Sequence, residues 1–231
     1  MLKLITLVTA VAGLAVALTV SASAAADTAP NAVGLLFETK HITGVTPGTE
    51  LVYKFERKPS DEKLLGPGYN DDIKIKVESE GAVPGKKNVV IEMFSGERAR
   101  DPNRITDLDG NPVLVVYLDT ALGHFRQLAG GDHAYLKNKF STSFIKDAKI
   151  AAVKVSYKGQ DVDGYRISVT PFANDPSRAK MRGYQNVEFS LVVSDKIPGH
   201  FAQMISNFGN QEKTAPTLEE RTTLDGVGDV K

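Results

Sequence analysis

Histidine titrates near neutral pH, so the histidines are the first candidates for proton transfer or metal binding. The chain has four, His41, His124, His133 and His200, and none lies in a nucleophile or metal-binding motif. His124 follows Asp119 by five residues, whereas residues that share a helix face are three or four apart. His133 directly follows Asp132 at an expected helix start. Solvation or local capping therefore explains these two histidines better than catalysis does.

The acidic run Asp107-Leu108-Asp109-Gly110-Asn111 could place several oxygens around a hard cation such as calcium. An EF-hand loop also requires glycine at its sixth position and glutamate at its twelfth. Those positions hold Pro112 and Leu118. A polar loop that leads into a helix is the better interpretation, with calcium binding as the alternative.

Nucleophile and phosphate motifs give no stronger candidate. The chain has no G-x-S-x-G sequence, and Gly66-Pro67-Gly68-Tyr69 lacks the lysine and the following helix of a phosphate loop. Cysteine is absent, which excludes disulfides, thiol catalysis and thiolate metal sites. The basic group Arg178, Lys180 and Arg182 fits a solvated loop, or a sparse site for acidic headgroups. We therefore expect no catalytic residue, metal or cofactor; a hydrolase without a recognisable motif is the least favoured alternative.

The N-terminus has the three parts of a secretory signal peptide, which we place at residues 1–26. Lys3 is followed by an apolar run over residues 4–20 and a small-residue stretch over residues 21–26. Cleavage would leave a chain that begins at Ala25 or Asp27. A membrane anchor of the same length is the alternative, but a spanning helix needs about 20 apolar residues. We expect a periplasmic or secreted protein without a stable membrane anchor.

The net charge of the chain is close to zero. The full sequence has 28 basic and 28 acidic residues, and loss of Lys3 with the signal peptide leaves 27 − 28 = −1, which argues against a nucleic-acid partner. Residues 27–209 are the length of a single β-rich domain. Residues 210–231 are polar, contain Pro216, Gly226 and Gly228, and lack apolar periodicity, so we expect a mobile tail.

Apolar and polar residues alternate at residues 51–55, 73–77, 89–93, 151–157, 165–169 and 187–193, which predicts strands. Between the two blocks, Asn111-Pro112 starts a helix that Gly130-Gly131 stops, and Asp132 caps a second helix. The predicted fold is α+β: a curled antiparallel sheet, forming an open half-barrel, with the central helical pair packed on its apolar face.

The first predicted helix carries an apolar stripe of Leu114, Leu118, Leu122 and Phe125. Such a stripe is most simply core, facing the sheet. Alternatively, part of it lines a ligand cavity, because helix faces opposed to curled sheets often leave apolar space. On this second interpretation Leu118, Leu122 and Phe125 are the candidate ligand-binding residues.

The order of these elements resembles the periplasmic lipoprotein carriers with the LolA/LolB-like open barrel. Local support comes from the strands at residues 49–57 and 185–194 and from the closing Ser194-Asp195-Lys196-Ile197-Pro198-Gly199. The stretch from Asn111-Pro112-Val113-Leu114 to Tyr135-Leu136-Lys137-Asn138 is also similar to uncharacterised periplasmic proteins of Gram-negative bacteria. The carrier resemblance implies an apolar cavity between sheet and helices that could hold an acyl chain.

The expected function is therefore a non-enzymatic periplasmic binding or carrier protein for an apolar ligand, such as a lipid chain or a lipidated partner. The alternative is a structural or protein-interaction module of the cell envelope, which would use an exposed strand edge or the tail.

Overall fold

The computed structural model of the chain describes residues 30–209 and 215–231, and their strands form one antiparallel sheet. Its ten strands lie in the order β10-β5-β6-β7-β8-β9-β1-β2-β3-β4, so the sheet is open, with β10 and β4 at its edges. The strands are β1 (Glu50–Pro59), β2 (Tyr69–Glu80), β3 (Lys87–Met93), β4 (Asn103–Leu108), β5 (Lys149–Tyr157), β6 (Gln160–Val169), β7 (Glu188–Val193), β8 (Phe201–Phe208), β9 (Leu218–Leu224) and β10 (Val227–Val230).

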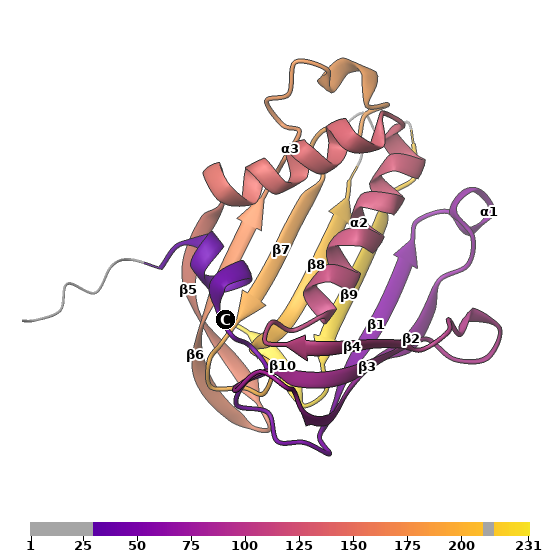
Figure 1. Cartoon of the computed structure of the whole chain (residues 1–231). Helices are drawn as coiled ribbons and strands as arrows, with labels where there is room; N and C mark the ends of the chain where they lie inside the picture. Colours follow the sequence, from indigo (N-terminus) through magenta and orange to yellow (C-terminus); the bar gives the residue numbers. More distant parts are fainter. Residues whose placement is uncertain (1–29, 210–214) are drawn as a thin grey trace, which may run out of the picture.

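Two long helices, α2 (Val113–Ala129) and α3 (His133–Lys146), cover one face of this sheet (Figure 1). The Asn111 side-chain oxygen accepts a 3.0 Å hydrogen bond from the Val113 N–H at the start of α2. Asp132 accepts one of 2.9 Å from the Tyr135 N–H and caps α3. Gly130, with φ of 76°, ends α2 in a conformation that glycine adopts without strain. The predicted helical pair and the α+β half-open fold are confirmed.

The remaining helical segments are short: η1 (Gly34–Glu38), α1 (Glu62–Leu65), η2 (Gly96–Arg98) and η3 (Arg178–Lys180). Of these, η1 lies near the end of α3 and the start of α2 (Figure 1). No helix in the described part of the chain is long and apolar enough to span a bilayer.

The predicted strands form because their alternate side chains fall on the covered face of the sheet. In β2, for example, Ile73, Ile75 and Val77 are buried. The hairpin between β5 and β6 turns at Lys158 and Gly159, both with positive φ as a two-residue hairpin loop requires. The sequence did not indicate β4 or β8.

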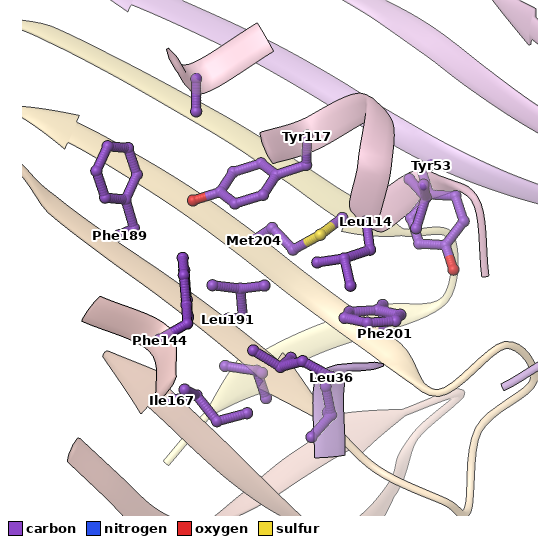
Figure 2. Packing of buried hydrophobic residues seen from close by; sticks show 14 of the residues in the cluster. Leu36, Tyr53, Leu114, Tyr117, Phe144, Ile167, Phe189, Leu191, Phe201 and Met204 are labelled. Carbon is purple, nitrogen blue, oxygen red and sulfur yellow. The ribbon is translucent and has the colours of Figure 1, made fainter. Parts of the chain in front are cut away.

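The core lies between the helices and the central strands, and Figure 2 shows part of it. Leu114 and Tyr117 of α2 lie over Met204 of β8, while Phe189 and Leu191 of β7 lie on the α3 side (Figure 2). The Tyr117 hydroxyl donates a 2.7 Å hydrogen bond to the backbone carbonyl of Ile205, so α2 is held to the sheet by a polar contact as well as by packing.

The expectation of a mobile tail at residues 210–231 is wrong for the part that the structure describes. Residues 215–231 contain β9, which lies in the middle of the sheet between β8 and β1, and β10, which pairs with β5. Leu218, Glu220, Thr222 and Leu224 all point inward and are buried. Two of these four are polar, which is why no apolar periodicity was visible in the sequence. Residues 210–214, like the predicted signal peptide at residues 1–26, lie outside the described residues.

The curl of the sheet brings β3 and β4 opposite the start of α2 (Figure 1). β3 and β4 curl beneath the N-terminal end of α2, and α2 rises away from the end of β4 (Figure 1). Because β4 leads into α2 through residues 109–112 alone, the strand and the helix diverge from a common corner.

Candidate ligand-binding groove

A groove of about 370 Å³ lies between the first two turns of α2 and the inner face of β3 and β4. Six chain segments contribute to its walls: η1 and the following loop, β3, the connection before β4, β4 itself, the 110–112 connection, and α2. The lining residues are Leu36, Phe37, His41, Ile91, Met93, Arg100, Asn103, Ile105, Leu108, Gly110, Asn111, Pro112, Leu114, Val115, Val116, Asp119 and Thr120. Apolar side chains of α2 form one wall of the groove, and apolar side chains of β3 and β4 form the opposite wall.

Large apolar side chains remain exposed at the rim of this groove. Phe37 is 48% exposed and Val115 is 68% exposed, and both line it. The Phe37 ring also meets Phe144 of α3 edge to face, with centroids 6.4 Å apart, so η1 is held against α3. Exposed apolar side chains at the mouth of an apolar groove are typical of a surface that a ligand or partner covers.

The polar groups near the corner of the groove are already satisfied within the protein. The Asn111 side-chain amide donates to the Tyr53 hydroxyl and to the Gly199 carbonyl, both at 2.8 Å. His41 Nε2 lies 2.9 Å from the Leu35 carbonyl, and the Asn111 N–H points to His41 Nδ1 at 3.5 Å. Since these groups are occupied, this end of the groove favours an apolar ligand group.

His41 packs in an aromatic cluster at this corner. Its ring lies 5.4 Å from the ring of His200 and 4.8 Å from that of Phe201. Burial lowers the pKa of His41, and the nearby His200 lowers it further, while the hydrogen bond to Leu35 and the charge of Asp109 act in the opposite direction. Burial also lowers the pKa of His200, against the attraction of Asp195. Both rings are therefore favoured in their neutral form.

The three candidate ligand-binding residues from the sequence lie deeper in α2 and do not line this groove. Leu122 and Phe125 are buried, and Leu118 is half-buried against the core. The Phe125 ring stacks on Phe172, with centroids 4.4 Å apart and planes 2° apart. Their packing matches the core interpretation of the stripe, and their role in ligand binding stays a prediction. The stripe residue that does line the groove is Leu114.

The other chemistry-bearing candidates have structural partners. His124 Nδ1 lies 2.7 Å from a carboxylate oxygen of buried Glu220, whose other oxygen lies 3.4 Å from Arg57 Nε. This network ties α2 to the sheet, a partner that the sequence did not reveal. His133 is exposed at the start of α3.

The acidic run that could have bound calcium supports the surrounding backbone. Asp107 accepts a 3.0 Å hydrogen bond from the Val83 N–H in the β2–β3 turn, and the Asp109 carbonyl accepts one from the Ile42 N–H. In the described part of the chain no group of three or more His, Asp or Glu side chains is arranged to hold a metal ion.

Sequence reasoning missed most of the groove because its residues come from separate segments. Phe37, His41, Ile105 and Leu108 lie in η1, the loop after it and β4, which the sequence did not predict to form elements. The apolar stripe of α2 pointed toward the groove, because Leu114 at its start lines it.

No family model matches the sequence, and no curated protein matches it either. Two solved structures are similar in arrangement. One is lipoprotein LppX from Mycobacterium tuberculosis, with a TM-score of 0.30 and 9% identity over 79% of this chain and 90% of LppX. The other is a LolA superfamily protein from Nitrosomonas europaea, with a TM-score of 0.20 and 10% identity over 88% of this chain and 94% of that chain.

Proposed function

We propose that this chain is a non-enzymatic binding or carrier protein that holds the apolar chain of a lipid, or of a lipidated partner, in the groove between α2 and strands β3 and β4. The observation that carries the proposal is the apolar groove itself, with Phe37 and Val115 exposed at its rim. Its volume of about 370 Å³ lies within the range of roughly 300–1,000 Å³ typical of small-molecule sites.

The polar side chains at the corner of the groove support a binding role rather than a catalytic one. The Asn111 amide is engaged by Tyr53, Gly199 and Val113. His41 is buried and contacts backbone groups through both ring nitrogens. A general base needs a free nitrogen within reach of a substrate proton. We therefore assign these residues to shaping the groove.

Binding of a neutral fluorescent polyene, the methyl ester of cis-parinaric acid, tests the proposal. The wild-type protein should enhance the probe's fluorescence in a saturable manner. Val115→Glu should weaken binding about tenfold, because a charge at the rim must be desolvated when an apolar chain binds. Val115 is exposed, so folding should be preserved.

Ile145→Glu is the matched control, because Ile145 is 62% exposed on α3 and does not line the groove. Its affinity for the probe should equal that of the wild type. Absence of saturable binding by the wild type, or equal weakening in both variants, would refute the groove as the site.

The exposed edge of β4 favours a second candidate, an interaction module of the cell envelope. β4 is an edge strand of six residues beside the groove, and an unpaired edge can accept a strand from another protein. Native mass spectrometry of protein purified from its own envelope separates the two functions. A co-purified lipid without protein supports the carrier, whereas a stoichiometric protein partner without lipid supports the module.

A further inference from the structure

Two opposite charges line the groove on opposing walls. Arg100 lies on the connection before β4, and Asp119 lies on the second turn of α2. Arg100 is the charged residue on the strand side of the groove, and Asp119 is the one on the helix side. Both are separated along the chain from the corner at residues 109–112. Asn103 and Thr120 line the groove beside them. The groove therefore passes from a corner without free polar groups to a mouth with a cation, an anion and two neutral polar side chains.

Neither of these charges is neutralised by an ion pair within the residues that the structure describes, 30–209 and 215–231. The neighbouring arginines differ: Arg98 pairs with Asp71 at 3.3 Å, and Arg104 with Glu78 at 2.6 Å.

Arg100 is held in place without losing its charge. Its backbone N–H donates a 3.0 Å hydrogen bond to the Met93 carbonyl, and its guanidinium lies 5.7 Å from the centre of the Phe94 ring. These contacts fix the residue beside the groove and leave the guanidinium free to bind an anion.

We propose that the groove binds a single-chain amphiphile with a zwitterionic headgroup, an anionic phosphate that meets Arg100 and an ammonium that meets Asp119. The inference rests on the proposed function and names the class of lipid. A purely anionic headgroup would be attracted by Arg100 and repelled by Asp119. A purely cationic headgroup would be attracted by Asp119 and repelled by Arg100. A neutral headgroup would gain from neither charge. A zwitterionic headgroup can pair with both charges at once.

The chain of such an amphiphile would lie toward the corner, against Ile91, Ile105 and Leu114, where the groove offers no free polar partner. The headgroup would remain at the mouth, partly in water. Exposed ion pairs contribute about 0.2–1 kcal/mol each, so each charge should change affinity by about 1.4- to fivefold.

Three competitors with the same palmitoyl chain test the headgroup, each measured by displacement of bound cis-parinaric acid methyl ester. They are lysophosphatidylethanolamine (zwitterionic), lysophosphatidate (anionic) and monopalmitoylglycerol (neutral), all below their critical micelle concentrations. The wild type should bind the zwitterion most tightly. High salt should reduce this preference, because exposed charges are screened.

The two charge variants should give crossed effects. Arg100→Gln should weaken binding of the zwitterion and of the anion by about 1.4- to fivefold each, whereas Asp119→Asn should weaken binding of the zwitterion and strengthen that of the anion. The neutral competitor should be unaffected in both. Arg104→Gln and Asp229→Asn remove exposed charges that do not line the groove, and should leave all three affinities unchanged.

The outcomes separate the two proposals. If the neutral probe does not bind the wild type, both proposals fail. If it binds but Arg100→Gln and Asp119→Asn leave the affinity for the zwitterion unchanged, the groove remains a lipid site and the zwitterion proposal fails. If the anion binds more tightly than the zwitterion in the wild type, the headgroup assignment also fails.

Discussion

Asn111 connects three distant parts of the molecule through one buried side chain. Its amide reaches the Tyr53 hydroxyl on β1 and the Gly199 carbonyl before β8, and its oxygen starts α2. Gly199 has a φ of 73°, and a Cβ there would lie 2.7 Å from the Asn111 amide nitrogen, so only glycine permits this approach. The corner of the groove therefore depends on a glycine and an asparagine that are 88 residues apart.

His41 should make the stability of the fold depend on pH. Its pKa is lowered in the folded protein, so the unfolded chain binds the proton more readily. The stabilising preference for neutral His41 is therefore complete above about pH 6.5 and is lost as the pH falls through its lowered value. Protonation of Nδ1 would also place a donor against the Asn111 N–H.

Urea unfolding at about pH 7.5 and about pH 5 measures this dependence. The free energy of unfolding should fall toward low pH, by at most about 1.4 kcal/mol per pH unit for one histidine. His41→Gln should reduce the slope, and the remainder should come from His200, whose pKa is also lowered. His133→Gln, at an exposed position, is the control and should keep the wild-type slope. An unchanged slope in His41→Gln would remove His41 as the cause.

Helix α2 has two roles that its sequence does not separate. Its first turns form one wall of the groove, through Leu114, Val115 and Val116. Its later turns pack into the core, where Phe125 stacks on Phe172. The helix is anchored to the sheet by Tyr117 at Ile205 and by His124 at Glu220. The wall is therefore held in position by contacts outside the groove.

Truncation of Leu122 should separate packing from binding. Leu122→Ala should lower the free energy of unfolding by about 2–5 kcal/mol, because it removes a buried side chain and leaves a cavity. Leu118→Ala, at a half-buried position, should cost less. Chemical denaturation measures both.

Probe titration on the same two variants tests the predicted ligand-binding role of these residues. Unchanged affinity for the parinarate ester would assign them to the core, whereas weakened binding in a folded variant would place them at the ligand. A Leu122→Ala protein of wild-type stability would contradict the packing of α2 on the sheet.

The C-terminal residues complete the sheet. β9 pairs with β1 over Tyr53–Leu224 to Pro59–Leu218 and with β8 on its other side. The Tyr184 hydroxyl donates a 2.6 Å hydrogen bond to the Pro216 carbonyl, just before β9. The two halves of the sheet therefore meet through a strand close to the C-terminus.

Deletion of residues 215–231 should abolish cooperative unfolding, because β8 and β1 lose their shared neighbour and buried side chains become exposed. Deletion of residues 227–231 alone removes only the four-residue edge strand β10, and should cost far less. Circular dichroism during thermal unfolding compares the two. A cooperative transition within about 4 °C of the wild type after the longer deletion would contradict the central position of β9.

The full chain, with its predicted signal peptide, should be exported. Expression in a Gram-negative host should give a processed protein in the periplasmic fraction, because residues 1–26 have the composition of a signal peptide. Intact-mass analysis should find a chain that begins at Ala25 or Asp27. Recovery of the full chain from Met1 in the membrane fraction would contradict it.

Elements whose pattern is local could be predicted from the sequence. Ile73, Ile75 and Val77 alternate along one strand, and Asn111, Gly130 and Asp132 mark helix ends through their own backbone and side-chain preferences. From these followed two blocks of strands, a helical pair and the α+β class. The resemblance to the carriers came from the same order of elements.

The position of β9 and the set of residues that form the groove depend on contacts between distant parts of the chain. β9 carries Glu220 and Thr222 on its inward face, and the Glu220 carboxylate pairs with Arg57 and His124, which come from other elements. The groove joins η1, β3, β4 and α2, and its walls face one another because the sheet curls. Alternation reports which face of an element is apolar, but which faces meet depends on strand pairing and curl, to which the whole chain contributes.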